Sequence, residues 1–427
     1  MPVIAWLLIV PLVLVLAWIG VSYLTRGTPI GAVETVGDGE PPAIESEGFL
    51  RMFGLHAKTP LDEGTSAEIF INGDQTYPRL WEDLRSAKHV ITLQMYYMQP
   101  GRLAEQLREI LIERGRAGVQ VFFLRDAFGS QKLKEEWFQP ICDAGARCES
   151  FRPVHWYQLH KSMHRSHIRV AVIDGRIGWT GGFGIDDKWL GDGRSDGHWR
   201  DTTVRFTGAA VEHLQAIFAD GWAEPTGELL TGHDLFPPPE RENDGILAGV
   251  VHAAPTQGST IGERLMAMPI SCARRRLWIS NSYFVPDHDF VGMMCEAAGR
   301  GVDVRILTCN EKGDVKSTWY AGRAKYEELM SAGVRIWEYQ PSMMHAKTLV
   351  ADGRLAIVGT LNFDNRSMAF NDESQFVAYD DGFGRKLEKI FEEDLEFSKE
   401  IRLEEFRRRP WRQRLLERFF DLFGRLL

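Results

Sequence analysis

The chain has 427 residues, of which 44% are apolar and 26% are charged, and its formal net charge is −9. This length favours two domains over one, and the composition excludes a largely disordered protein. The acidic balance gives no support to a nucleic-acid-binding protein, because such proteins usually carry a basic surface. The five cysteines show neither CxxC pairs nor zinc-finger spacing, which predicts reduced thiols rather than disulfides or a metal site.

The first segment is uncharged and almost wholly apolar from Val3 to Leu24. About 20 such residues suffice to span a hydrocarbon core, so residues 1–26 are predicted to form a transmembrane anchor. A cleaved signal peptide is the alternative, but neither a basic start nor a small-residue cleavage site is evident. Arg26 follows the segment and nothing basic precedes it, which favours a single span with a cytoplasmic body. Residues 27–48 are acidic and rich in Gly and Pro, which is typical of a linker.

The rest of the chain repeats one order of elements. Each copy begins with an apolar strand, continues through a helix and reaches a second strand after a glycine turn. These elements are expected at 90–97, 103–116 and 118–124 in the first copy, and at 277–284, in a helix ending at Arg300, and at 301–307 in the second. Strands alternating with helices indicate an α/β fold with mostly parallel sheets. We therefore predict two similar lobes, 49–235 and 236–400, with one site at their interface.

Two histidine motifs, one in each copy, carry the candidate chemistry. In both motifs a basic residue follows the histidine by two positions and an aspartate follows it by seven. The motifs contain His167, Arg169 and Asp174 in the first copy, and His345, Lys347 and Asp352 in the second. Residues two apart on a strand face the same side. An imidazole can attack phosphorus or move a proton, and a fixed cation binds the oxygens of a phosphodiester.

These motifs resemble the HxKxxxxD repeats of the phospholipase D superfamily, in which two copies build one active site. Four further stretches look like the cardiolipin synthase branch of that superfamily: Trp199–Arg205, Tyr283–Pro286, Ala297–Arg305 and Gly359–Ser367. The resemblance runs from about residue 85 to residue 380. It implies two phospholipase D-type lobes, each a mostly parallel sheet flanked by helices. It also implies transfer of a phosphatidyl group from phosphatidylglycerol through a phosphohistidine, at the inner membrane of a bacterium.

The resemblance also assigns roles to the two histidines. One histidine attacks the phosphodiester and the other moves protons to and from the alcohols; His167 is assigned as the nucleophile and His345 as the acid–base catalyst. Asp201 and Glu373 match the family's downstream carboxylates, which orient the imidazoles.

The remaining motif residues are expected to bind phosphate or to support the fold. Arg169, Lys347 and Asn362 supply charge and hydrogen bonds to the phosphate, so neither a metal nor another cofactor is implied. Asp174 and Asp352 are expected to be structural partners within each motif rather than proton carriers.

Two departures from the family pattern fall in the first copy. Arg169 stands where the family has Lys, and Gly184 stands where it usually has Asn. Arg keeps the charge but is bulkier than Lys, and Gly184 lacks a phosphate donor. A degenerate first half-site is therefore an alternative, although the retained His167, Asp174 and Asp201 argue for activity.

Four basic residues crowd the first motif, namely His160, Lys161, His164 and Arg165. They could form a lipid headgroup site, but a solvated basic loop is the favoured interpretation. In the second copy, Arg366 is expected to be an intramolecular ion-pair partner.

The last segment, 401–427, combines basic and apolar residues. From Arg407 to Leu427 there are seven arginines against two acidic residues, and apolar residues recur at helical spacing. This pattern is typical of an amphipathic helix that lies in an anionic membrane surface. A helix that packs its apolar stripe on the body, or on a second subunit, is the alternative.

Four functions stay open at this point. The first is a transferase with phospholipid substrates, and the second is a hydrolase of the same site that releases phosphatidic acid. The third is a nuclease, which the acidic balance and the membrane segments disfavour. The fourth is a scaffold with an inactive site, which rests on the two departures in the first copy.

Overall fold

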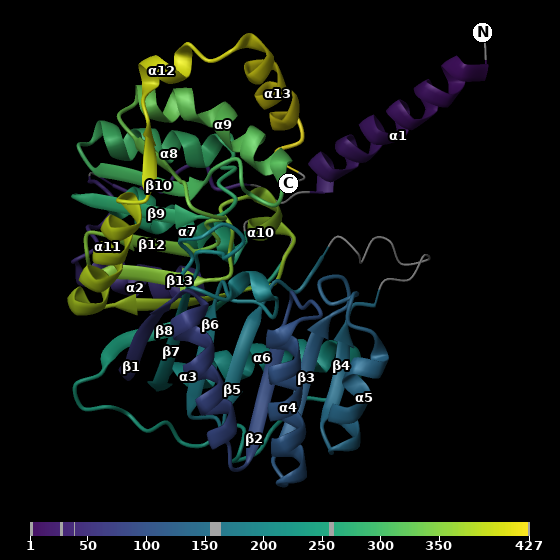
Figure 1. Cartoon of the computed structure of the whole chain (residues 1–427). Helices are drawn as coiled ribbons and strands as arrows, with labels where there is room; N and C mark the ends of the chain where they lie inside the picture. The colour runs from purple at the N-terminus through teal and green to yellow at the C-terminus, as the bar shows by residue number, and fades with distance from the viewer. Residues whose placement is uncertain (1–2, 26–28, 38, 154–163, 256–259, 426–427) are drawn as a thin grey trace.

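The computed structural model describes residues 3–25, 29–37, 39–153, 164–255 and 260–425. Two halves of similar architecture lie one above the other, each a sheet with helices on both faces, and α1 (Val3–Thr25) extends away from them (Figure 1). Among the described residues, no helix combines the length and the hydropathy that crossing a membrane requires. The N-terminal span therefore stays a prediction, and Arg26, on which its orientation rests, lies outside the described residues.

The described residues of the first half form seven strands and four α-helices. Its strands are β1 (Asp62–Ile71), β2 (Val90–Met95), β3 (Gln120–Asp126), β4 (Arg147–Phe151), β5 (Arg169–Ile173), β6 (Ile177–Gly181) and β7 (Thr202–Gly208). Its helices are α3 (Asn72–Ser86), α4 (Arg102–Arg116), α5 (Glu135–Asp143) and α6 (Ala210–Thr226). Helices α3, α4 and α5 cover one face of the sheet and α6 covers the other (Figure 1).

The second half repeats this arrangement and adds one edge strand. Its strands are β8 (Ile246–Ala253), β9 (Arg276–Asn281), β10 (Asp303–Cys309), β11 (Arg335–Tyr339), β12 (Lys347–Ala351), β13 (Leu355–Gly359), β14 (Glu373–Tyr379) and β15 (Ser398–Ile401). Its helices are α7 (Ile261–Cys272), α8 (His288–Gly299), α9 (Lys316–Ser331), the short α10 (Asn365–Ala369) and α11 (Asp381–Leu395).

All described strands join one mixed sheet, in which both halves have the same strand order. The order is β1-β7-β6-β5-β2-β3-β4 in the first half and β8-β14-β13-β12-β9-β10-β11 in the second, with β15 beside β11. The halves meet where β1 pairs with β8 in antiparallel fashion. The predicted repeat is therefore a repeat of topology as well as of sequence.

The prediction of mostly parallel sheets is wrong. Among the described strands, parallel pairing is confined to β2–β3–β4 and to β9–β10–β11. Strands β5 and β6 are joined by a tight turn at Asp174 and Gly175, both with positive φ, and so they pair antiparallel. A connection this short allows only antiparallel neighbours, because parallel strands need a crossover of about a dozen residues. The same hairpin joins β12 to β13.

The helix that precedes the first half in the chain belongs to the core of the second half. Ser46 caps α2 (Glu47–Ala57) by accepting a hydrogen bond from the Phe49 backbone N–H at 3.1 Å. Phe49 and Phe53 are fully buried and pack in one apolar cluster with α7 residues such as Leu265. Sequence analysis placed this segment in the first lobe, whereas its buried face lies against the second.

The C-terminal segment forms two helices rather than one. Ile401 ends β15, α12 runs over Leu403–Arg407, and Pro410 precedes α13 (Trp411–Asp421). A proline has no backbone N–H to continue the preceding helix, but it suits the position just before a new one. Helix α13 packs on α9, as Lys325 on α9 forms a 2.7 Å salt bridge with Asp421.

Candidate active site

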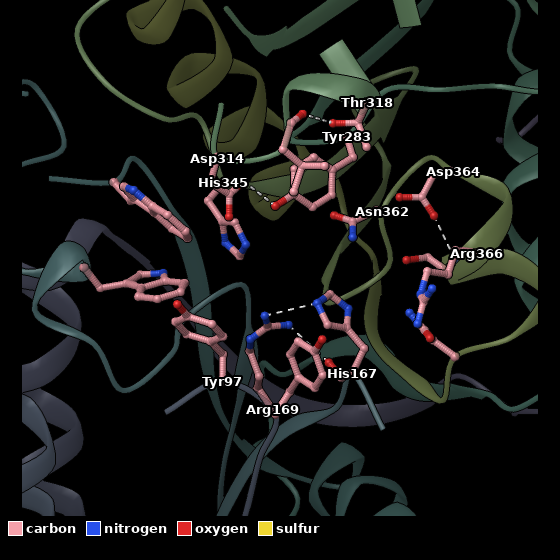
Figure 2. A pocket seen from close by; sticks show the side chains of 16 residues that line it. Tyr97, His167, Arg169, Tyr283, Asp314, Thr318, His345, Asn362, Asp364 and Arg366 are labelled. Atoms are coloured by element: carbon pink, nitrogen blue, oxygen red, sulfur yellow. Dashed lines mark hydrogen bonds between the residues drawn. The ribbon is translucent and has the colours of Figure 1, made fainter. Parts of the chain in front are cut away.

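One cavity of about 320 Å³ lies between the two halves. The first half contributes His167 and Arg169 to its wall, and the second contributes His345 and Asn362. Figure 2 shows the two histidines approaching the same space from opposite sides. Residues that are far apart in the sequence thus share one site at the interface of the repeats.

In each motif the basic residue lies directly against its histidine. Arg169 Nη2 is 3.1 Å from His167 Nε2, and Lys347 Nζ is 3.1 Å from His345 Nε2. All four side chains are buried. The strands β5 and β12 begin at the basic residues, so the pleat that places positions i and i+2 on one face brings each pair together.

Each histidine is held by a carboxylate from the other half. His167 Nδ1 lies 2.9 Å from Glu373 Oε2, and His345 Nδ1 lies 2.9 Å from Asp201 Oδ2. Backbone bonds accompany both pairs: the His167 N–H donates to the carbonyl oxygen of Asp372 at 2.9 Å, and the His345 N–H donates to that of Arg200 at 2.7 Å. Each half-site therefore consists of a histidine from one half of the protein and a carboxylate from the other half.

The charges of this site are set by burial. Burial is the main cause that lowers the pKa of His167 to about 4 and that of His345 to about 3, and the facing carboxylates oppose it only in part. Burial also disfavours ionised Asp201 and Glu373, yet their histidine partners outweigh it and lower the pKa of both carboxyls. Both imidazoles are thus neutral at pH 7, with the proton on Nδ1 and the Nε2 lone pair facing the basic residue of the same motif.

Lys347 and Asn362 are positioned through one serine. Lys347 Nζ donates to Ser282 Oγ at 2.8 Å and to the carbonyl oxygen of His345 at 2.6 Å. Ser282 Oγ in turn donates to Asn362 Oδ1 at 2.9 Å, which leaves the amide nitrogen of Asn362 for the cavity. Burial lowers the pKa of Lys347 to about 7. A phosphodiester in the cavity would meet an amine, an amide N–H and a guanidinium.

The two motif aspartates lie outside the cavity lining. Asp174 accepts the backbone N–H groups of Lys88, His89 and Val90 at 2.8–2.9 Å. Asp352 accepts the three equivalent groups at 274–276 at 2.8–2.9 Å. Each aspartate therefore fastens the start of the neighbouring strand, β2 or β9, and positions the motif without touching the reacting atoms.

The space beside Gly184, the altered position in the first half, is filled by the ring of Trp189. A Cβ added to Gly184 would lie 2.8 Å from the ring of Trp189. Trp189 Nε1 donates to Asp201 Oδ2 at 2.6 Å, and its ring meets His345 edge-on at a centroid distance of 5.1 Å. Gly184 thus makes room for an indole that supports the carboxylate of the opposite histidine.

The basic cluster before the first motif is described only in part, because His160 and Lys161 lie outside the described residues. His164 Nδ1 is 3.1 Å from the carbonyl oxygen of Phe370. Arg165 is buried and forms a 2.9 Å salt bridge with buried Asp126. The interpretation as a solvated loop is therefore wrong for Arg165, which fastens the motif to the end of β3.

Several cavity residues were not predicted as part of the site. Tyr97 and Tyr283 follow β2 and β9 at equivalent places, each two residues after the strand ends, and that equivalence is the signal that could have found them. Tyr283 Oη donates to Asp314 at 2.6 Å, so the cavity wall also contains a carboxylate. Trp189 and Trp199 come from an irregular loop with no periodic pattern, and they flank His345.

The family model and the curated relatives agree on one family. The family model described as "Cardiolipin synthase, PLD-like domain" matches residues 267–395. The cardiolipin synthase of Geobacillus kaustophilus (strain HTA426) is 36% identical over 391 residues, which cover 91% of this chain and 77% of that protein. Cardiolipin synthase 2 of Bacillus anthracis is 36% identical over 366 residues, which cover 85% and 71% of the two chains.

A solved structure shares the fold. The crystal structure of phosphatidylserine synthase from Haemophilus influenzae Rd KW20 matches with a TM-score of 0.70, covering 88% of this chain and 99% of that one. At 13% identity the match shows common architecture alone. The paired histidine motifs, the shared cavity and the sequence identity over nine-tenths of its length show that this chain belongs to the cardiolipin synthase family of the phospholipase D superfamily.

Proposed function

We propose that this protein is a membrane-bound phosphatidyltransferase that joins two phosphatidylglycerol molecules into cardiolipin through a phosphohistidine. The observation that carries the proposal is the crossed pairing at the cavity. His167 and His345 are both neutral, both bound through Nδ1 to a carboxylate, and both unprotonated at Nε2, which lies beside a phosphate-binding cation. One imidazole can therefore attack phosphorus while the other moves the proton.

In the first step the donor phosphodiester binds to Arg169, Lys347 and Asn362. The anion raises the proton affinity of the neighbouring imidazoles, so that His345 carries a proton at Nε2. His167 Nε2 forms a bond to phosphorus, the bond from phosphorus to the glycerol oxygen breaks, and the proton of His345 goes to that oxygen. Free glycerol leaves, and the phosphatidyl group stays on His167.

In the second step the neutral His345 removes a proton from the hydroxyl of a second phosphatidylglycerol. The alkoxide oxygen attacks phosphorus, the bond to His167 breaks, and cardiolipin leaves. Two displacements give net retention of configuration at phosphorus. The crossed carboxylates stabilise the imidazolium forms that appear in both steps, which is the role of an acidic partner in other catalytic histidines.

The overall reaction is tested with purified protein and labelled phosphatidylglycerol, with lipids separated by thin-layer chromatography. Labelled cardiolipin and free glycerol are the expected products. Phosphatidic acid as the sole product would show that water is the acceptor and would reject the transferase.

The assignment of the nucleophile needs a separate experiment. After rapid quenching in base, in which phosphohistidine is stable, the label should be found on the peptide that contains His167. Label on the peptide with His345 would reverse the two roles, and label on neither histidine would overturn the covalent mechanism. His167→Ala should abolish the label, whereas near wild-type transfer by that variant would remove His167 from the mechanism.

The membrane contact is supported by the way α13 lies on the protein. Its polar residue Glu417 is buried and pairs with Arg323 and Arg409 at 3.3 and 2.7 Å. Phe420 stacks on Tyr320 of α9, but the other apolar residues of the helix face outward: Leu415 is 60% exposed and Phe419 is 51% exposed. Most of the apolar stripe therefore does not pack on the described body, and the exposed arginines between these residues match an anionic lipid surface.

Vesicle binding tests this contact in a chain that lacks residues 1–26. Leu415→Glu combined with Phe419→Glu should reduce binding to phosphatidylglycerol vesicles at least tenfold. The double variant lacks two apolar side chains that would enter the lipid, and it adds two negative charges that the anionic surface repels. Leu229→Glu is the matched control, since Leu229 is 71% exposed elsewhere and should not change binding. Equal binding by both variants would remove α13 from the membrane contact.

The uncharged segment at 3–24 supports a single N-terminal span in the inner membrane of a bacterium, with a cytoplasmic catalytic body. The test is a reporter enzyme fused to the C-terminus that is active only in the cytoplasm. Activity is the expected result, and an inactive but expressed fusion would contradict the orientation.

A further inference from the structure

One wall of the catalytic cavity carries a cation that the two reaction steps do not use. Arg366 lines the cavity beyond Asn362, on the side away from Tyr97 (Figure 2). Its guanidinium forms no salt bridge or hydrogen bond with any residue in the described parts of the chain, so the expected close ion pair is not formed, and its charge acts at longer range on buried Asp364. A half-buried arginine that faces a cavity without a partner is well placed to bind an anion.

Two buried polar atoms lie in the same wall without a partner. Ser367 is 2% exposed and Asn371 is 7% exposed, and both line the cavity. Neither Ser367 Oγ nor Asn371 Oδ1 forms a hydrogen bond within the described residues. Buried polar atoms are nearly always paired, so two that are unpaired beside one unpaired cation indicate a ligand with acceptor and donor groups.

The acidic neighbour does not cancel this charge. Asp364 accepts the backbone N–H of Ser367 at 2.7 Å, which commits one of its oxygens to the start of α10. Burial raises the pKa of Asp364 to about 7, so a large part of this carboxyl is protonated at neutral pH. The positive charge of Arg366 is therefore only partly offset by Asp364 and is available to a ligand.

We propose that Arg366, Ser367 and Asn371 form a second phosphate site that binds the phosphodiester of the acceptor lipid. The inference rests on the proposed function, in which the acceptor has a phosphate of its own. One glycerol separates the two phosphates of the product, so the acceptor's phosphate must lie near the attacked phosphorus but outside its binding site. Arg366 and the Ser367 hydroxyl donate to the acceptor phosphate, and Asn371 Oδ1 accepts from the free hydroxyl of the linking glycerol.

This site would favour transfer over hydrolysis. Water and neutral alcohols have no phosphate, so they gain nothing from Arg366. An acceptor with a phosphodiester is held by charge-assisted hydrogen bonds with its hydroxyl near His345, which raises its effective concentration at the phosphohistidine.

Two soluble acceptors that differ in the phosphodiester test the site. The full-length protein in detergent with phosphatidylglycerol as donor receives either labelled glycerol or labelled glycerophosphoglycerol, and label entering the lipid phase is measured. Arg366→Gln should lower the ratio of kcat/KM for glycerophosphoglycerol to that for glycerol about tenfold or more, the effect of losing one charge-assisted hydrogen bond. Ser367→Ala should shift the ratio in the same direction by less. Arg176→Gln is the matched control, because Arg176 is exposed and pairs with Glu240 far from the cavity.

The outcomes separate this proposal from the proposed function. A ratio unchanged in both variants overturns the site, and so does an equal loss with both acceptors, which would place Arg366 at the donor phosphate. Ser367→Ala decides the matter if Arg366→Gln does not fold, as judged by its thermal unfolding. A wild-type protein that labels lipid with neither acceptor, and makes no cardiolipin, would overturn the proposed function instead.

Discussion

His167 Nδ1 lies 2.9 Å from Oε2 of Glu373, a residue 206 positions later in the chain. The reverse relation holds for His345 and Asp201, also at 2.9 Å. Each half of the protein holds the motif histidine of the other, so neither half contains a complete site. The geometry of both pairs depends on how the halves are joined, and the halves are joined in one continuous sheet through β1 and β8.

Replacing Glu373 by Gln should lower kcat for transfer by two to four orders of magnitude, on the order of the effect of neutralising the carboxylate of a catalytic triad. The neutral amide of the glutamine does not stabilise an imidazolium at His167, and it does not select the tautomer of His167 that carries its proton on Nδ1. Steady-state transfer of labelled phosphatidylglycerol measures the effect, with thermal unfolding as the control for folding. Asp201→Asn should have the same effect, since the carboxylate of Asp201 orients His345 as that of Glu373 orients His167. Activity within twofold of wild type in either variant would contradict the orienting role.

Restoring the family's asparagine at Gly184 should reduce activity rather than improve it. The new Cβ would lie 2.8 Å from the ring of Trp189, which is held at 2.6 Å from Asp201. Displacing the indole removes a donor from that carboxylate, and overpacking costs about 1–3 kcal/mol. We expect transfer by Gly184→Asn to fall at least tenfold and its unfolding temperature to drop by several degrees. A variant as active as the wild type would show that the tryptophan does not support the site.

The activity should decline as the pH rises through about 7. Burial lowers the pKa of Lys347 to about 7, so above this pH the free protein loses the charge that binds the donor phosphate. On the acidic side His167 stays unprotonated down to about pH 4, which leaves the nucleophile available. A profile of kcat/KM against pH should therefore fall on the alkaline side with a midpoint near 7.

Lys347→Arg provides the check on this assignment. Its guanidinium stays charged, so the alkaline fall should move above pH 9 even if the maximum rate is lower. An alkaline midpoint near 7 in both proteins would assign the titration to another group.

Replacing Asp352 by Asn should lower stability more than catalysis. The carboxylate accepts three backbone N–H groups at 274–276, and the amide nitrogen of Asn would face one of them. The loss of one charge-assisted hydrogen bond and the new donor–donor contact should together cost about 2–3 kcal/mol of unfolding free energy. Denaturant unfolding measures this cost, while kcat should remain within about threefold of wild type at a temperature where the variant is folded. A large fall in kcat without a loss of stability would place Asp352 in the chemistry.

The local elements and the duplication were predictable because they depend on local patterns. The helix expected at 103–116 corresponds to α4, and the strand expected at 301–307 corresponds to β10, since periodicity and glycine turns act over a few residues. The family was predictable for the same reason: its motifs are short, and their spacing is visible in one chain. The direction of strand pairing was not predictable in this way, because the alternation of strands and helices indicates parallel pairing, whereas the hairpins at 169–181 and 347–359 make their strands antiparallel.

The sequence alone thus determined the repeat, the family and the residues of the two histidine motifs. Only the tertiary structure decided which carboxylate serves which histidine, that Trp189 fills the space left by Gly184, and that the apolar side of α13 faces outward. The physical reason is that a side chain's partners across an interface depend on how whole sheets and helices pack. Residues such as Glu373 and His167 are brought together by this packing, and no local pattern in the chain encodes their contact.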